Sequence, residues 1–378
     1  MKIHKKTLIK SNSPRSNTRT HAAEFDTLRF NQHVHNIFKT ITAAALGLSL
    51  LTACSGNSGN SAAPSGENGL RTLRVANMTG QPDQYADFIG QQQGIFEKHG
   101  INLQTTEFVA GINTVDSIVT GTADTGLLAD FAAVNRFGNT LEATNLVIFS
   151  DLSSSTTTSG GIYVAPEYAD DLSKLADSAG WITNIGTVAE YYNWQAQTYL
   201  GLDPDMQKVV QASDSPTTLA LVQNGGASAI VASGSQAEKV EEYGWVKAAE
   251  AKDVNIHISA YLITTKDFAA ANTDLLADYL TALDESVQYL NDHLDESAKA
   301  ISERFGVDEE IFKSNWAQYN IKFGLSEEGA ANLDNVNEWA FEHGKFPTEY
   351  NIRQFYFKDA AEKAFPGSTD VDLSGVNQ

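Results

Sequence analysis

The stretch "NTVDSIVTGTADTGLLA" (residues 113–129) resembles a second stretch about 100 residues later, "TTLALVQNGGASAIVAS" (residues 217–233). The two align without gaps, so that Gly121 matches Gly225. Each stretch is typical of an apolar helix, a turn of the form G-x-A-[DS] and a short strand of small and aliphatic residues. Gly and Ala are common, so chance is one explanation of the match. The other is that the chain has two lobes, each with one helix–turn–strand unit of this kind.

Strands and helices alternate around the first of these stretches. Residues 72–78, "TLRVANM", and residues 101–108, "INLQTTEF", have the alternation of strands. Between them, residues 82–100 place aromatic and aliphatic side chains at helical spacing, and a second helix is expected over 112–121. Strand, helix, strand and helix at this spacing predict a parallel sheet flanked by helices, because parallel strands need crossover connections.

The C-terminal third is predominantly helical from Ala271 onward, with Thr273 as the expected N-cap. A leucine-rich stripe with helical spacing predicts a buried helix face, formed by Leu276, Leu280, Leu283, Val287, Leu290 and Leu294. We expect this helical section to pack back onto one lobe.

The N-terminal region has the order of a secretory signal. A basic segment precedes the apolar run Ile41–Ala53, which is too short to span a bilayer comfortably. The only cysteine of the chain, Cys54, follows directly, and the stretch "LTAC" resembles a bacterial lipobox, in which the cysteine is lipidated. Residues 55–69 are rich in Gly, Ser and Asn and predict a flexible tether.

Charge and cysteine content exclude several classes of protein. Of the 26 Lys+Arg and 47 Asp+Glu residues, 8 and 2 precede Cys54, which leaves 18 and 45 after it and a net charge of −27. Such a charge argues against nucleic acid as a partner, which needs a basic footprint. A single cysteine allows no disulfide within the chain, so stability must come from the core.

Residues 90–134 resemble the first lobe of periplasmic-binding-protein-like receptors of ABC transporters. The similar group takes up nitrate, taurine, alkanesulfonates and thiamine-related pyrimidines. The motifs that carry the resemblance are Gly94–Ile95–Phe96, Gly100–Ile101 and Gly121–Thr122–Ala123–Asp124, and in the second lobe residues 185–214 with their "GLDP". Their order and spacing are matched over roughly residues 70–350.

The resemblance implies an α/β, two-lobed fold (type II), in which each lobe is a sheet flanked by helices and a helical C-terminal section lies on lobe one. The expected parts are a lipoprotein signal peptide (1–53), the tether (54–69), the first part of lobe one (70–165), lobe two (166–257), and the return to lobe one with the C-terminal helices (258–378).

The function that follows is that of a receptor, held at the extracytoplasmic face of the cell membrane by lipid on Cys54. We expect a monomer that binds one small solute between its lobes, of the sulfonate, taurine or nitrate type, and delivers it to an ABC permease. A thiamine-precursor pyrimidine or an amine is the alternative ligand. A pyrimidine-synthase-like enzyme is the alternative of another class, but its cysteine–histidine-rich signature has no match here.

Candidate ligand contacts are polar and aromatic residues at the expected strand ends and helix starts. They are Thr79, Gln81, Gln84, Tyr85, Asp130, Phe131, Ser153, Ser154, Thr187, Glu190, Tyr191, Ser233 and Gly234. Helix N-termini with small polar residues suit an oxyanion, although the same residues are ordinary N-caps. Asp130 and Glu190, with no evident Lys or Arg beside them, favour an amine or aminopyrimidine instead. No catalytic residue, metal site or cofactor is expected, because the histidines have no ligand spacing and phosphate-loop and nucleophile motifs are missing.

Overall fold

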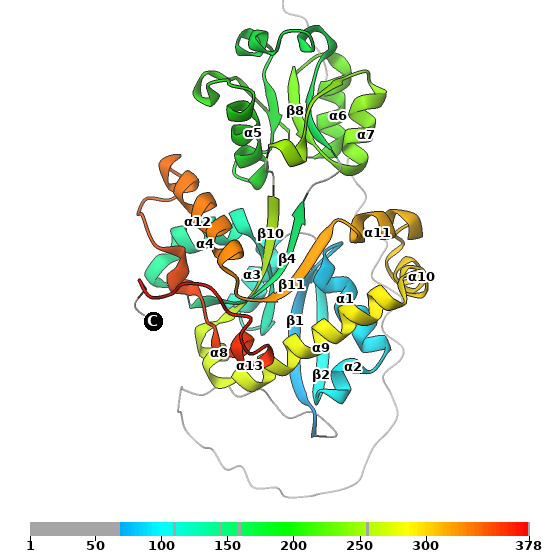
Figure 1. Cartoon of the computed structure of the whole chain (residues 1–378), viewed down its shortest axis with the longest axis vertical. Helices are drawn as coiled ribbons and strands as arrows, with labels where there is room; N and C mark the ends of the chain where they lie inside the picture. Colours follow the sequence, from blue (N-terminus) through cyan, green and yellow to red (C-terminus); the bar gives the residue numbers. More distant parts are fainter. Residues whose placement is uncertain are drawn as a thin grey trace, which may run out of the picture. The chain divides into compact units, whose positions relative to one another are not determined.

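The computed structural model describes residues 69–108, 111–143, 145–156, 160–212, 214–254 and 257–376. They form two mixed sheets, each with its own helices (Figure 1). The expected signal peptide and Cys54 lie outside the described residues, as does the tether except for its last residue. These parts of the prediction therefore remain predictions.

The first sheet has the strand order β11-β4-β10-β3-β1-β2. Its strands are β1 (Arg71–Met78), β2 (Ile101–Phe108), β3 (Thr125–Ala129), β4 (Leu146–Thr156), β10 (His257–Thr265) and β11 (Tyr319–Gly324). β1 pairs in parallel with β2 and β3, while β10 is antiparallel to β3 and β4. The middle of β1 is buried on both faces, as expected for a parallel strand covered by helices on each side.

The second sheet has the order β7-β6-β8-β5-β9. Its strands are β5 (Gly161–Val164), β6 (Trp181–Thr183), β7 (Val209–Gln211), β8 (Ala229–Ala232) and β9 (Val246–Glu250). β5 belongs to this sheet, although the expected boundary at residue 165 assigns it to lobe one. The short apolar run of β5 does not encode this placement, because it has no periodicity that distinguishes the two sheets. We propose that lobe two begins by residue 161.

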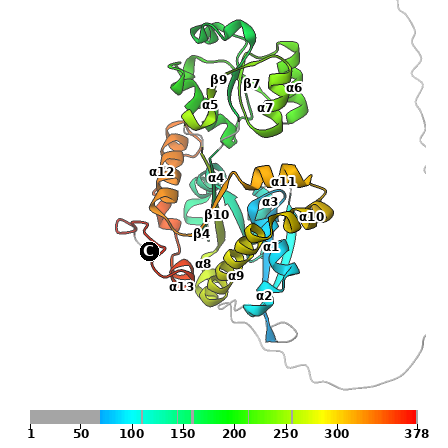
Figure 2. The same cartoon turned by 45° about the vertical axis from the view of Figure 1, so that its right-hand side comes forward.

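The helices of the second lobe are α5 (Val188–Tyr199), α6 (Ser215–Asn224) and α7 (Gly234–Glu242). Those of the first lobe are α1 (Pro82–Gln92), α2 (Ile95–Lys98), α3 (Gly111–Val119), α4 (Asp130–Thr140), α8 (Lys266–Ala271), α9 (Thr273–Asp292), α10 (Leu294–Phe305), α11 (Glu309–Trp316), α12 (Glu327–Glu342) and α13 (Asp359–Ala364). α1 and α9 lie on one side of the first sheet, and α4 and α12 lie on the other (Figures 1 and 2).

The two similar stretches of sequence form equivalent units, which confirms one unit per lobe. α3 leads into β3 in the first sheet, and α6 leads into β8 in the second. Gly121 and Gly225 follow these helices with φ of 73° and 67°, a left-handed conformation that ends a helix and favours glycine. Asp124 and Ser228 form another matched pair, three residues after the glycines. The Asp124 carboxylate accepts the Arg74 N–H (2.8 Å), and the Ser228 hydroxyl accepts the Ala179 N–H (3.1 Å). Both side chains thus cap the backbone at the neighbouring parallel strand.

The leucine-rich stripe of α9 is buried, as its spacing predicts. The N-cap is Asn272 and not Thr273, because the chain leaves α8 only one residue earlier and Thr273 already has helical geometry. Leu294 starts α10 and is only partly buried.

Two hydrophobic clusters form the core. The smaller one belongs to the second lobe and includes Tyr163, Val240 and Trp245. The larger one fills the first lobe and continues through Tyr191 and Tyr192 of α5 to one face of the second sheet. The lobes are therefore joined by apolar packing as well as by the strands that connect them.

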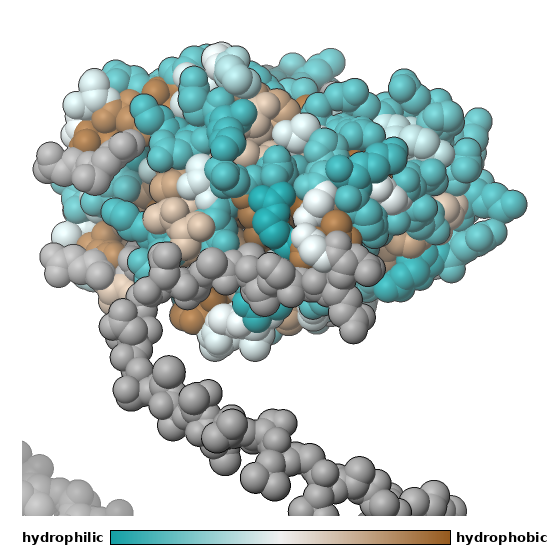
Figure 3. Space-filling view, turned by 90° about the horizontal axis from the view of Figure 1, so that it is seen from below, coloured by the Kyte–Doolittle hydropathy of each residue, from teal (hydrophilic) through white to brown (hydrophobic). Residues whose placement is uncertain are grey.

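Among the described residues, no helix is both long and apolar enough to cross a membrane. One face of the molecule is shown in Figure 3, where hydrophilic side chains predominate and apolar ones form separate patches.

Candidate functional site

A pocket of about 350 Å³ lies at the end of the first sheet where β4 leaves and β10 returns. Its lining comes from β4, β10, β11 and the start of α12, and consists of Asp151, Ser153, Ser154, Ser259, Ala260, Tyr261, Asn320, Lys322, Ser326, Glu328, Gly329 and Asn332. Hydroxyls, amides and charged groups dominate this lining. In α/β proteins, ligands bind at the ends of the strands near changes of connection, and the volume suits a small solute.

Two larger depressions are less suited to a ligand. One, of about 650 Å³, includes Leu146 and Val147 at the opposite end of β4. The other, of about 710 Å³, is an acidic groove along α12 that includes Glu338, Glu342 and Glu349. The smaller pocket is the candidate site because the predicted residues Ser153 and Ser154 lie in its wall.

Asp151 is the buried charge of this pocket. Its Oδ2 accepts hydrogen bonds from the Ser326 N–H (3.0 Å) and hydroxyl (2.6 Å), at the N-cap of α12. Its Oδ1 is buried and has no hydrogen-bond partner among the described residues. Burial raises the pKa of Asp151 to about 6, although the Ser326 bonds and the charge of Lys322 lower it.

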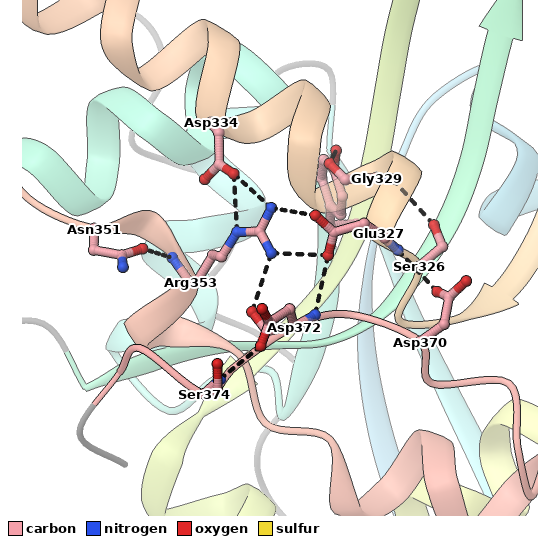
Figure 4. A network of polar contacts seen from close by, with 10 residues as sticks. Ser326, Glu327, Gly329, Asp334, Asn351, Arg353, Asp370, Asp372 and Ser374 are labelled. Carbon is pink, nitrogen blue, oxygen red and sulfur yellow. Dashed lines mark hydrogen bonds and ion pairs between the residues drawn. The ribbon is translucent and has the colours of Figure 1, made fainter.

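The start of α12 is held in place by a polar network around Arg353 (Figure 4). The Arg353 guanidinium binds both oxygens of Glu327 (2.6 and 2.8 Å) and also Asp334 (2.9 Å). The Glu327 N–H donates to Asp370 (2.8 Å). This network fixes the helix turn that carries Ser326, and thereby the position of the Asp151 carboxylate.

The residues predicted after β1 lie apart from the pocket lining. Thr79 is exposed and Gln81 is the N-cap of α1. Gln84 is buried, and its Oε1 accepts the Gly80 N–H (2.7 Å). Tyr85 packs edge-on against Phe305 and Phe312, with ring centroids 5.8 and 5.0 Å away. The Tyr85 ring is thus occupied within lobe one, whereas the Gln84 Nε2 is buried without a hydrogen-bond partner among the described residues.

Two buried carboxyls lie on α1 beside these residues. Asp83 and Asp87 are both 0% exposed, and neither oxygen of Asp83 has a hydrogen-bond partner among the described residues. Asp87 accepts from the Tyr279 hydroxyl (3.2 Å). Burial raises the pKa of Asp83 to about 7, and burial followed by the charge of Asp83 raises that of Asp87 well above its usual range.

Asp130 and Phe131 start α4 and are buried beside the pocket. The Asp130 carboxylate accepts the N–H groups of Phe131 (2.6 Å) and Ser259 (3.0 Å) and the Asn332 amide (3.2 Å). Ser259 and Asn332 line the pocket, so Asp130 lies behind its wall. Burial raises the pKa of Asp130, although the hydrogen bonds from these N–H groups lower it.

Two of the predicted residues at the start of α5, Thr187 and Glu190, act within the fold. Thr187 is the N-cap and accepts the Ala189 N–H (3.3 Å). Glu190 accepts the Gly186 N–H (3.0 Å) and also binds the Lys345 ammonium (2.8 Å). The expectation that no Lys lies beside Glu190 is therefore wrong, because the segment after α12 brings Lys345 there from 155 residues away.

Tyr191 is part of an aromatic contact between the lobes. Its ring lies 5.1 Å from that of Trp339 on α12, and Trp339 also lies 6.3 Å from Trp194 and 6.1 Å from Phe131. The remaining predicted residues, Ser233 and Gly234, are the N-cap and first residue of α7, and the Ser233 side chain makes no cap hydrogen bond. The structure thus groups Ser153 and Ser154 in the pocket, with Asp130 behind its wall and Phe131 and Tyr191 on Trp339.

Sequence reasoning missed most of the pocket. Asp151 stands in the hydroxyl-rich stretch "SDLSSSTTT" (residues 150–158), and an acidic residue among serines is the one signal that could have identified it. Asn320, Lys322 and Asn332 come from β11 and α12, where no motif marks them. Within the described ranges, no three His, Cys, Asp or Glu side chains are grouped so that they could hold a metal ion.

Comparison with known proteins supports the fold. No family model and no curated protein sequence matches the chain. Among solved structures, the chain is similar to the periplasmic aliphatic sulphonate binding protein SsuA from Escherichia coli, with 16% identity, a TM-score of 0.62, and coverage of 75% of this chain and 96% of that one.

Two further structures have the same fold. The periplasmic nitrate-binding protein NrtA from Synechocystis PCC 6803 matches with 14% identity and a TM-score of 0.57, covering 82% of this chain and 90% of its own. The alkanesulfonate-binding protein SsuA from Xanthomonas axonopodis pv. citri, bound to MOPS, matches with 13% identity and a TM-score of 0.59, covering 79% and 100%. The chain therefore has the two-lobed periplasmic-binding-protein fold that its motifs predict.

Proposed function

We propose that this protein is the solute-binding receptor of an ABC importer and works by binding, not by catalysis. The observation that carries the proposal is the polar pocket of about 350 Å³ at the end of the first sheet, where the chain crosses to the second lobe. In a protein of this fold, that is where a ligand contacts the strand ends. The similar structures are named for sulfonate and nitrate, so these ligands belong in the first test.

The receptor acts through two lobes that close on the solute. A ligand favours the closed state only through contacts that both lobes make with it. The aromatic contact of Tyr191 and Trp194 with Trp339 joins α5 of the second lobe to α12 of the first, so we expect it to act as the pivot of this motion. The released solute passes to a membrane permease, and lipid on Cys54 keeps the monomeric receptor beside it.

A thermal-shift screen of the full chain, purified in mild detergent, tests the receptor function. The panel contains alkanesulfonates, taurine, nitrate, amines and aminopyrimidines. A solute at 100 times its dissociation constant adds about 2.7 kcal/mol to stability, which is a visible rise in melting temperature. X-ray scattering with the best solute then shows compaction if the lobes close. A panel without any stabilising solute contradicts the proposal.

A further inference from the structure

The chemistry of the pocket is unusual for a site that receives an anion. Asp151 is only 8% exposed, lines the pocket, and has one buried carboxylate oxygen, Oδ1, that has no hydrogen-bond partner among the described residues. A buried acceptor without a donor costs free energy, and a carboxylate facing a sulfonate or nitrate costs more. A ligand that supplies a donor removes this cost.

The local structure confines the Asp151 carboxylate and leaves it little freedom to turn. β4 is irregular at this point, because its register with β10 shifts between Ser153 and Asp151. Such bulges re-aim side chains near binding sites. On the other side, a Cβ on Gly329 would lie only 2.8–3.0 Å from the Asp151 carboxyl atoms, so glycine makes room for the carboxylate there.

The charged and titratable groups around Asp151 do not neutralise it fully. From β11, Lys322 lines the pocket, is exposed, and forms no ion pair in the described part of the chain. From the C-terminal segment, Asp370 adds negative charge, as does Glu328 of α12 at the pocket edge. Tyr261 and Tyr356 also face the carboxyl and are themselves buried. A competing explanation is that Asp151 serves only to cap α12.

We propose that Asp151 receives a positively charged nitrogen of the solute, so that this receptor binds small molecules with an ammonium group and not simple anions. The inference rests on the proposed receptor function and names the ligand class of that site. The ammonium group of Lys322, at the exposed edge of the pocket, is available to pair with a second, acidic group on the same solute.

Three probes with the same two-carbon chain test this assignment by isothermal titration calorimetry with the full chain. They are ethanolamine, taurine and isethionate, of which the last carries a sulfonate and a hydroxyl but no ammonium. At least tenfold tighter binding of ethanolamine or taurine than of isethionate supports the inference. Isethionate binding as tightly as both overturns it but leaves the receptor function standing. If none binds at up to about 10 mM, both the inference and the receptor function lose their support.

Variants separate ligand binding from helix capping. Asp151→Asn keeps the shape and should weaken binding of the better ammonium probe about 10- to 100-fold, since a charged hydrogen bond is lost. Asp308→Ala removes the N-cap of α11, which lies outside the pocket lining, so it should lower the melting temperature and retain binding. Equal losses of binding in Asp151→Asn and Asp308→Ala show that a lost helix cap alone accounts for the effect and overturn the inference.

The pH profile supplies a readout that a structural role does not predict. Because the pKa of Asp151 is raised to about 6, its carboxylate forms as the pH rises from 5 to 7. Ethanolamine stays protonated over this range, so its affinity should rise severalfold in the wild type and stay level in Asp151→Asn. A flat profile in the wild type contradicts the inference.

Discussion

The Lys345 ammonium lies 2.8 Å from the Glu190 carboxylate and so ties the segment after α12 to the first turn of α5. Both side chains are largely shielded, with 19% and 25% exposure. The same ammonium lies 5.7 Å from the Trp339 ring centroid, where the aromatic contact between the lobes is centred. Charge and aromatic packing therefore act together at the junction of the two lobes.

This ion pair should contribute measurably to stability. We expect a double-mutant cycle with Lys345→Met and Glu190→Gln to give a coupling of about 0.5–1 kcal/mol, because the pair is partly shielded from solvent. Methionine keeps an unbranched stem against Trp339, and glutamine retains an acceptor for the Gly186 N–H. Urea denaturation measures the four free energies of unfolding. Additive losses contradict a direct interaction.

Asp130 should matter for folding more than for binding. Its two oxygens already accept three N–H groups, so Asp130→Asn places a donor against a donor and should cost about 1–3 kcal/mol. The affinity for the best solute should change less than twofold, as measured by calorimetry below the unfolding temperature. Asp177→Asn, at an exposed position in lobe two, is the control for charge alone. A loss of affinity without a loss of stability contradicts this account.

The parts of the fold that follow from local sequence were predictable. Gly121 and Gly225 mark helix ends because few other residues adopt a positive φ, and the α9 stripe appears because burial imposes a helical period. β11 was not foreseen, because its strand is short and only partly buried. Its membership in the first sheet depends on pairing with β4, more than 160 residues away.

The candidate site was predictable only in part, for a related reason. Ser153 and Ser154 stand where the chain crosses between lobes, so their position follows from the fold. Tyr85 is a residue type that often contacts ligands, but its ring packs against Phe305 and Phe312. Contacts of this kind, like that of Lys345 with Glu190, join residues distant in sequence, and no spacing in the sequence encodes them.

Cys54→Ala tests the lipid anchor. Two or more acyl chains on one residue give stable membrane binding, so the wild type should sediment with membranes. The variant should be found in the soluble fraction or as unprocessed precursor, which immunoblotting after fractionation distinguishes. Ser55→Ala, next to the cysteine, is the control and should behave as the wild type. Complete membrane retention of a normally cleaved Cys54→Ala protein contradicts lipidation.

The buried Asp83 should make the folded state less stable as the pH rises. Its folded-state pKa is about 7, above the ordinary 3.8, so the folded protein keeps this proton where the unfolded chain has lost it. The stabilisation is complete below about pH 4 and is lost as the pH rises through 7. Asp87 of α1 and the hydroxyls of Tyr279 and Tyr319 face this group. No Lys, Arg or His side chain among the described residues forms an ion pair with Asp83.

Asp83→Asn should remove this dependence. Between pH 5 and 8 the free energy of unfolding of the wild type should fall by about 1–3 kcal/mol more than that of the variant. At pH 8 the variant should therefore be the more stable of the two, because the wild type buries a charge there. Asp116→Asn, on the exposed face of α3, is the matched control and should follow the wild type. Urea titrations at each pH measure the difference, and parallel curves for wild type and Asp83→Asn would show that Asp83 is charged and paired in solution.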